Sequence, residues 1–275
     1  MATHDPDTIK EAVRDRYAGH ARTRTSCCSS SSSCGSGSSA LLVPGYNAED
    51  LSQLPADADL GLGCGNPLAL ESVREGEAVV DLGAGGGIDC FLAARRVGPT
   101  GHVIGVDMTP EMVLLAQRNA KTTGVENVEF RLGEIEDLPV EDEVADLIIS
   151  NCVLNLVPDK QRAFAEAFRV LKPGGRISVS DIVTTGPLPE AARVSVGAYV
   201  ACLGGALPLE DYLAAARAAG FGDVHVASET AYAATDDEAE ELLGAFADSA
   251  DIPRDEAVRA AQLFRSVTVQ GVKPV

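Results

Sequence analysis

The sequence lacks a long hydrophobic run, and it has few histidines and few basic residues. No stretch reaches about 18 consecutive apolar residues, the length that a membrane-spanning helix requires. The opening residues, MATHDPDTIKEAVRDRY, have neither the basic start nor the apolar middle of a secretory signal. These absences argue against a membrane-embedded or secreted protein and predict a cytoplasmic location.

Basic residues are scarce, because 22 Lys and Arg stand against 41 Asp and Glu, for a formal net charge of −19. Such a surface repels phosphate backbones and anionic lipid head groups, so we expect neither nucleic acid nor a membrane as a partner. The acidity also fits a very salty cytosol, because the Debye length near 1 M salt is only about 3 Å and self-repulsion is screened. Adaptation to high salt is therefore a hypothesis from composition.

Strand-like and helix-like segments alternate through the middle of the chain. The strand-like segments are rich in Val and Ile, as is typical of strands that are covered on both faces. The pattern predicts an α/β fold with a doubly wound, mostly parallel sheet. The expected strands are AVVDLG, HVIGVD, VEFRLGEI, VADLIIS and RISVSDIV, and the expected helices are IDCFLAARRVG, EMVLLAQRNAKTTG and DKQRAFAEAFRVLKPGG, the last ending at its two glycines.

The two ends of the chain depart from this alternation. Residues 8–19 predict a short amphipathic helix, and TSCCSSSSSCGSGSSA after it has too little apolar mass to pack. We therefore expect an N-terminal helix and a flexible Cys/Ser-rich segment over residues 1–40, and the main domain over residues 41–230. Residues 231–275, with an acidic helix and a final strand, predict a small C-terminal α+β accessory segment.

A glycine-rich turn follows the first strand. In VVDLGAGGGID, Asp81 ends the strand, and Gly83, Gly85 and Gly87 lie in the turn before a helix. Glycines let the backbone approach a ligand closely, and the start of a helix offers free N–H groups. The same glycines can serve only a tight strand-to-helix turn, so this motif needs support from elsewhere.

Two more segments supply that support. The dinucleotide fingerprint requires Gly at its sixth position, which is Ile88 here, so a pyrophosphate site is disfavoured. The next strand ends in Asp107, whose carboxylate can accept hydrogen bonds from both ribose hydroxyls. Glu134 and Ile135 follow the third strand, where they can meet the rim of an adenine. Together these residues predict a nucleoside site.

These motifs resemble those of the S-adenosylmethionine-dependent methyltransferase superfamily over roughly residues 76–183. The shared features are an acid before G-x-G-x-G, an acid ending the second strand and an acid after the third. The resemblance implies a Rossmann-like methyltransferase fold with S-adenosylmethionine as cofactor. It also implies that the methionyl part is held by Asp81 and the glycines, the ribose by Asp107, and the adenine by Met108, Glu134 and Ile135.

The choice of methyl acceptor depends on the side chains near that site. An oxygen or carbon acceptor normally requires a general base, yet the chain has only four histidines. His102 opens a strand and His225 lies within one, where a structural or surface role is the usual one. The cysteines are better placed for the reaction.

Three cysteines occur in turns or at element ends in three parts of the chain. Cys152 follows the fourth strand, Cys64 lies in the turn GLGCGNP, and Cys202 lies where a helix breaks at two glycines. Thiolates converging from such positions can bind one soft metal or metalloid ion. Spacing alone does not establish convergence, and a free cysteine is most often a small buried hydrophobe, which suits Cys90 on its apolar helix face. The tail cysteines lack the paired C-x-x-C spacing of a zinc site; they are Cys27, Cys28 and Cys34.

Longer motifs resemble the arsenite S-adenosylmethionine methyltransferase family nearly word for word. They are DLGAGGGIDCFLAA, GVDMTPEM, GEIEDLP, SNCVLNLVPDK and GLGCGNP, and the likeness covers most of residues 40–230. The resemblance implies that Cys64, Cys152 and Cys202 bind arsenic, and that Asn151 lies near the donor sulfonium. It implies arsenite or its thiol adducts as substrate and a small thiol or thioredoxin-type reductant as partner. The family often pairs the GCGNP cysteine with an N-terminal one, for which only CCSSSSSC offers candidates.

The prediction is thus an enzyme that methylates thiol-bound trivalent arsenic, whose lone pair can attack the methyl carbon. One alternative is a carbon methyltransferase for a quinone or sterol-like acceptor, which would be indifferent to Cys152. Another is a non-catalytic thiol-based metalloid-binding protein. A non-catalytic protein could lose the residues that hold the methyl donor, yet Asp81, Asp107 and the glycines are all present.

Overall fold

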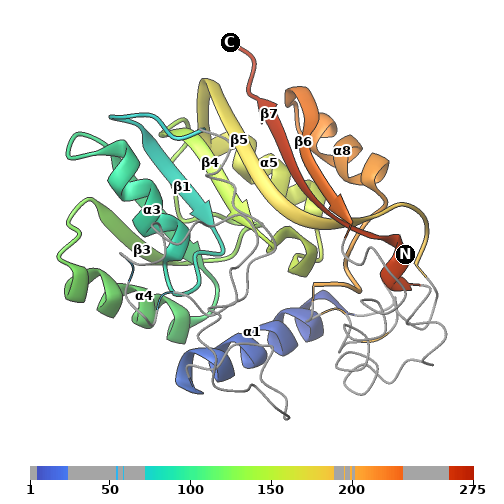
Figure 1. Ribbon diagram of the computed structural model, residues 1–275, viewed down its shortest axis with the longest axis horizontal. Helices are drawn as coiled ribbons and strands as arrows, with labels where there is room; N and C mark the ends of the chain where they lie inside the picture. The colour runs from blue at the N-terminus through green and yellow to red at the C-terminus, as the bar shows by residue number, and fades with distance from the viewer. Residues whose placement is uncertain are drawn as a thin grey trace.

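The computed structural model describes residues 5–23, 54, 58, 72–188, 195, 199, 202–231 and 260–275. Its centre is a seven-stranded sheet of order β3-β2-β1-β4-β5-β7-β6 (Figure 1). Neighbouring strands are parallel except at β7, which is antiparallel to both β5 and β6. The strands are β1 (Ala78–Leu82), β2 (His102–Asp107), β3 (Val128–Leu132), β4 (Ala145–Asn151), β5 (Leu171–Thr184), β6 (Gly222–Ala231) and β7 (Phe264–Val272). The predicted α/β fold with a mostly parallel sheet is confirmed.

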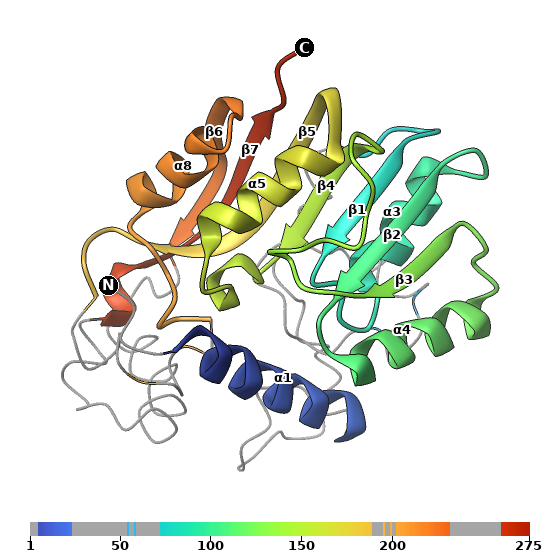
Figure 2. The ribbon, with the colours of Figure 1, turned by 180° about the vertical axis from the view of Figure 1, so that it is seen from behind.

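Helices cover both faces of the sheet, as a doubly wound fold requires (Figures 1 and 2). The helices α3 (Ile88–Val97) and α4 (Pro110–Thr123) contribute Phe91 and Val113 to one apolar cluster. The opposite cluster contains α5 (Lys160–Val170) and α8 (Leu209–Ala218), whose Phe164 and Tyr212 rings lie edge to face with centroids 5.5 Å apart. The central strands are buried from both sides, which explains their nearly uninterrupted apolar sequences.

The helix α5 ends earlier than its sequence predicts. We expected it to stop at Gly174 and Gly175, but it ends at Val170 and β5 begins at Leu171. The reason is tertiary pairing, because Gly174 N–H donates to Lys273 O (2.9 Å) and Lys273 N–H donates to Gly175 O (2.8 Å). The two glycines are therefore drawn into the sheet.

The last strand, β7, confirms the predicted final strand and lies between β5 and β6. Residues 264–272 therefore belong to the same sheet as the main domain. The predicted acidic helix, over residues 236–248, lies outside the described residues. The division of the chain at residues 40 and 230 stays a prediction.

The N-terminal helix α1 (Pro6–Thr23) is longer than the predicted residues 8–19. It lies across the carboxyl ends of the parallel strands in both views (Figures 1 and 2). Its Tyr17 and Ala21 pack against Met112 and Leu115 of α4. Among the described residues, no helix has the length and apolar character needed to cross a membrane.

Candidate active site

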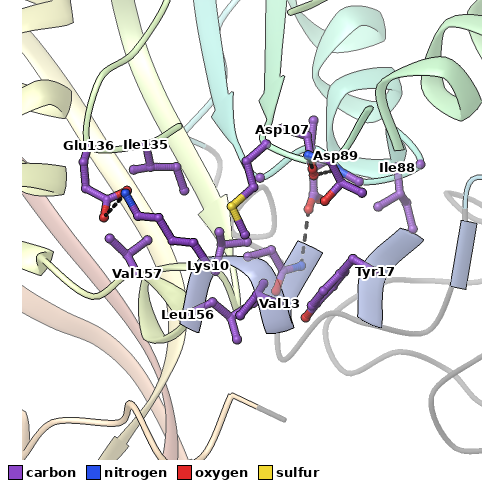
Figure 3. A pocket seen from close by; sticks show the side chains of 18 of the residues that line it. Lys10, Val13, Tyr17, Ile88, Asp89, Asp107, Ile135, Glu136, Leu156 and Val157 are labelled. Atoms are coloured by element: carbon purple, nitrogen blue, oxygen red, sulfur yellow. Dashed lines mark hydrogen bonds and ion pairs between the residues drawn. The ribbon is translucent and has the colours of Figure 1, made fainter. Parts of the chain in front are cut away.

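A cavity opens at the carboxyl ends of β1, β2 and β4, between the sheet and α1 (Figure 3). This is the edge at which doubly wound sheets bind ligands. The side chains of Asp89 and Asp107 enter it from one side, and those of Val13 and Tyr17 enter from α1 on the other. The cavity therefore has an acidic wall and a largely apolar cover.

The glycine turn after β1 forms part of the floor, and its glycines have different tasks. Gly83 and Gly85 line the cavity with φ angles of 75° and 51°. A Cβ atom on Gly83 would come within 2.5 Å of a Val153 methyl group. Gly87, which the sequence also assigned to the ligand, does not line the cavity, and a Cβ there would collide with the Phe91 ring at 2.8 Å. Gly87 thus serves packing beneath the turn.

Asp107 lies where the sequence predicts a ribose-binding carboxylate. Its Oδ2 accepts a hydrogen bond from Gly85 N–H (3.0 Å), and its Oδ1 accepts one from Thr109 N–H (2.8 Å). Burial raises the pKa of the Asp107 carboxyl, while these two N–H groups oppose that rise. Met108 and Ile135 line the cavity as well, in agreement with the predicted adenine side.

Asp81 does not line the cavity, although the sequence assigned it to the methionyl part. It is buried beneath the turn and accepts a hydrogen bond from Cys90 Sγ (3.1 Å). Burial, followed by the nearby Asp89 charge, raises the pKa of the Asp81 carboxyl well above its usual range. Asp89 is the carboxylate that meets the cavity, and its Oδ2 accepts a hydrogen bond from Asn151 Nδ2 (3.3 Å). Sequence reasoning missed Asp89, although an acid in the first helical turn after a glycine-rich turn was a usable signal.

In the loop after β3, too, a neighbouring acid lines the cavity in place of the predicted one. Glu134 does not line the cavity; its side chain is 39% exposed and accepts a 2.6 Å hydrogen bond from Lys10 Nζ. Glu136 lines the cavity instead, 3.1 Å from the same Lys10 Nζ and with 8% of its side chain exposed. The two pairs anchor α1 over this end of the cavity, and Figure 3 shows the pair of Lys10 with Glu136. The sequence predicted α1, but only the structure shows that it contributes to the site.

The two cysteines that the structure describes near the site lie together. Cys202 Sγ donates to the backbone O of Cys152 (3.3 Å), and both residues are buried. Cys152 has a φ of 60° and Cys202 a φ of 65°, which few non-glycine residues adopt and which often marks functional positions. The chain neighbours of Cys152, Asn151 and Val153, both line the cavity.

A side chain from α1 reaches the same thiol. Tyr17 lines the cavity, and its hydroxyl lies 3.8 Å from Cys202 Sγ. Cys152 is disulfide-bonded, whereas Cys90 and Cys202 are not in a disulfide, so neither of these two is its partner. Cys64 and the tail cysteines lie outside the described residues; the tail cysteines are Cys27, Cys28 and Cys34. Two members of the predicted three-thiol set, Cys152 and Cys202, are thus neighbours through this contact, and their binding of one arsenic stays a prediction.

The arrangement suits a nucleoside that carries a cationic chain. Asp107 can accept hydroxyl hydrogen bonds, and Asp89 can face a positive group. Apolar side chains exclude water around them, and the Cys152–Cys202 pair lies at the adjoining edge.

Comparison with known proteins agrees with this geometry. A family model described as "Methyltransferase domain" matches residues 74–241. The chain is 46% identical to the arsenite methyltransferase of Halobacterium salinarum over 267 residues, which cover 92% of this chain and 68% of that protein. It is 38% identical to the arsenite methyltransferase of Aquipseudomonas alcaligenes, covering 80% of this chain and 62% of that one. The chain thus spans about two thirds of these relatives.

A solved structure is similar along most of the chain. It is an arsenic(III) S-adenosylmethionine methyltransferase from Chlamydomonas reinhardtii, with 35% identity and a TM-score of 0.62. The match covers 83% of this chain and 71% of that one.

Proposed function

The chain belongs to the arsenite methyltransferase family, and from this premise we propose that it transfers a methyl group from S-adenosylmethionine to trivalent arsenic bound by its own cysteines. The observation that carries the proposal is the contact of Cys202 Sγ with the Cys152 backbone (3.3 Å) beside the nucleoside-shaped cavity. Thiolates are the preferred protein ligands of soft metalloids, so this pair suits arsenic as the substrate.

The residues that line the cavity support S-adenosylmethionine as the methyl donor. Asp107 would accept the ribose hydroxyls, while Met108 and Ile135 would contact the adenine. We assign the methionyl ammonium to Asp89 rather than to Asp81, because only Asp89 faces the cavity. When bound, the cofactor would supply an electrophilic methyl group on a sulfonium. A lone pair in line with the carbon–sulfur bond can attack its carbon, and the uncharged thioether leaves. The apolar side chains of α1 help to keep water from that reaction.

The cysteines both capture and orient the substrate. Arsenic arriving as a thiol adduct exchanges onto Cys152 and Cys202: each protein sulfur forms a bond to arsenic, and its proton leaves with the departing thiol. The two protein sulfurs and one ligand kept from the adduct leave a lone pair on the pyramidal arsenic, which becomes the nucleophile. Cys64 remains our candidate for a third or redox ligand, outside the described residues.

The proposal requires a reductant. The new arsenic–carbon bond uses the arsenic lone pair, so two electrons must be returned before the arsenic can react again. Cys152 is disulfide-bonded in this structure, and in that form it cannot bind arsenic. A small thiol or a thioredoxin-type protein would supply two electrons to the arsenic, and two more to open this disulfide by thiol–disulfide exchange; in each step the reductant leaves as a disulfide.

Substitution of the cysteines tests the function. Purified Cys152→Ser and Cys202→Ser variants are incubated with donor, thiol and arsenite, and the arsenic species are separated by chromatography. We expect each variant to lose about 100-fold or more of the methylation rate, because serine does not replace a thiolate toward arsenic. Cys90→Ser is the control, since this thiol does not line the cavity and a serine hydroxyl can keep its hydrogen bond to Asp81. Full arsenite methylation by Cys152→Ser would refute the ligand assignment. Absence of methylated arsenic with the wild type would refute the function and favour a carbon acceptor.

A further inference from the structure

The side chain of Asn155 links the chain segments that carry the two thiols. Asn155 lies in the 3-10 helix η2 (Leu154–Leu156), three residues after Cys152, and it is completely buried. Its Nδ2 donates to Ile182 O (2.6 Å) and to Cys202 O (3.2 Å). The short segment from Cys152 to Asn155 therefore carries one thiol and also binds the backbone of Cys202.

The orientation of this amide follows from its partners. Two carbonyl oxygens can be met only by the NH₂ group, so the amide cannot be turned around. Its Oδ1 is then left without a hydrogen-bond partner among the described residues. A buried unpaired oxygen destabilises a fold, and such a group calls for a specific explanation. The two N–H bonds at the thiol site provide one.

The backbone of Asn155 is fixed as well. Its N–H bonds to the buried carboxyl of Asp181 on β5, and its O lies 3.5 Å from the buried Lys160 Nζ of α5. Lys160 Nζ also donates to Val157 O (3.1 Å), the residue that follows η2. Because both the backbone and the side chain are tied to the sheet and to α5, Asn155 offers a rigid point of attachment.

The segment of Cys202 rests directly on this point. A Cβ atom on Gly205 would lie only 2.0 Å from Asn155 O, a distance that no side chain can occupy. Gly205 does not have a left-handed φ, so it is the close approach that requires glycine here. Cys202 itself is held on both sides, because its N–H donates to Tyr199 O (3.0 Å) and its O accepts from Asn155.

We infer that Asn155 is a positioning residue of the arsenic site, which sets the place of Cys202 relative to Cys152 so that both sulfurs reach one arsenic. The inference rests on the proposed function, because it assumes that these two cysteines bind the substrate. Asn155 does not line the cofactor cavity, so its effect should be confined to arsenic.

The first test compares Asn155→Ser with Asn127→Ser. Asn127 is the matched control because its Nδ2 also joins two backbone oxygens, of Ala94 and Gly98 (both 2.9 Å), away from the cysteines. Arsenite binding to the phosphine-reduced proteins is measured by equilibrium dialysis, and S-adenosylhomocysteine binding by calorimetry. We expect Asn155→Ser to weaken arsenite binding at least tenfold and to change nucleoside binding less than twofold. Asn127→Ser should change neither.

A thiol-bridging reagent measures how close Cys152 and Cys202 lie. A role of Asn155 in fold stability alone would not change this result. Dibromobimane joins two thiols only when they lie close together, so its Cys152–Cys202 product should decrease in Asn155→Ser and not in Asn127→Ser. Melting temperatures are recorded for all variants. Equal losses of melting temperature with unchanged arsenite binding and bridging in both variants would overturn the inference.

A second pair keeps the inference testable if Asn155→Ser does not fold. Gly205→Ala should displace the Cys202 segment, whereas Gly186→Ala should be harmless because its Cβ would meet nothing nearer than 4.0 Å. We expect only Gly205→Ala to weaken arsenite binding. Cys202→Ser distinguishes failure of the proposed function from failure of the positioning role. If this variant binds arsenite as tightly as the wild type, the proposed function fails. If it loses arsenite while a folded Gly205→Ala or Asn155→Ser retains it, only the positioning role fails.

Discussion

Asp89 and Asp81 differ in whether their side chains face the cavity, and this difference decides which of them can contact a ligand there. Both acids flank the same glycine turn, yet Asp89 faces the cavity from the first turn of α3 while Asp81 is enclosed beneath it. Asn151 donates to Asp89 and also lines the cavity. Of these two acids, only Asp89 can therefore meet a cationic group in the cavity.

Replacing Asp89 should affect only ligands that carry the amino acid group. We expect Asp89→Asn to weaken S-adenosylhomocysteine binding by about tenfold or more, since a hydrogen bond to a charged group contributes about 1.5–3 kcal/mol. Binding of 5′-methylthioadenosine, which lacks that group, should change less than twofold. Calorimetry measures both affinities.

The control for this change is Asp211→Asn, an exposed acid in the first turn of α8. It should leave both affinities as they are. An equal loss for both nucleosides in Asp89→Asn would mean that the carboxylate shapes the cavity without contacting the ammonium.

At the scale of elements, α1 turns an open sheet edge into an enclosed site. Ile9 and Val13 are buried one helical turn apart, and Tyr17 follows on the same face. Ion pairs of Lys10 with Glu134 and Glu136 fix the first half of the helix, and Arg22 pairs with Glu111 near its end. The helix is thus held by its apolar face and by pairs at both ends.

Placing a charge on the buried face of α1 should detach the helix. We expect Val13→Asp to weaken S-adenosylhomocysteine binding at least tenfold, because an unpaired carboxylate cannot remain in the apolar cover. Hydrogen exchange in α1 should become faster, while that of β1 and β4 should stay slow. Thr8→Asp adds the same charge at an exposed position of the helix and should do neither. Unchanged affinity in Val13→Asp would show that α1 is not required for the cofactor.

The elements themselves could be predicted because each strand is nearly continuous in apolar residues and each helix is amphipathic. The end of α5 could not, since it depends on Lys273, about a hundred residues away in the chain. Docking of α1 likewise depends on partners in the loop after β3.

The sequence predicted at which edge of the sheet the site lies, but not which side chains face it. Asp107 and Asn151 lie at the ends of strands, and the carboxyl-edge rule places them correctly. Glu134 and Glu136 are two positions apart, and the motif alone could not show which one faces the ligand. The predicted convergence of Cys152 and Cys202 agrees with their contact, although spacing could not have revealed Asn155 as the link.

At the scale of the whole molecule, the dominant property is charge. The net charge of −19 is spread over a chain of only 275 residues, so the folded state is under electrostatic self-repulsion. Several ion pairs lie at the surface, such as Arg169 with Asp142 (2.6 Å), and pairs of this kind offset little of that repulsion.

Salt should therefore stabilise the protein. We expect the melting temperature to rise by several degrees between 0.05 M and 1 M KCl, because the Debye length shortens from more than about 10 Å to about 3 Å. Thermal unfolding at a series of KCl concentrations, followed by circular dichroism, measures the effect. A flat or falling curve would contradict the hypothesis of adaptation to a salty cytosol.

Tyr17 contacts two parts of the site, since it lines the cavity and its hydroxyl lies 3.8 Å from Cys202 Sγ. A displacement of α1 wide enough to exchange a spent donor for a fresh one would also withdraw this hydroxyl from the thiol. On the proposed mechanism, donor exchange through such a displacement would therefore also change the surroundings of the metalloid-binding thiol.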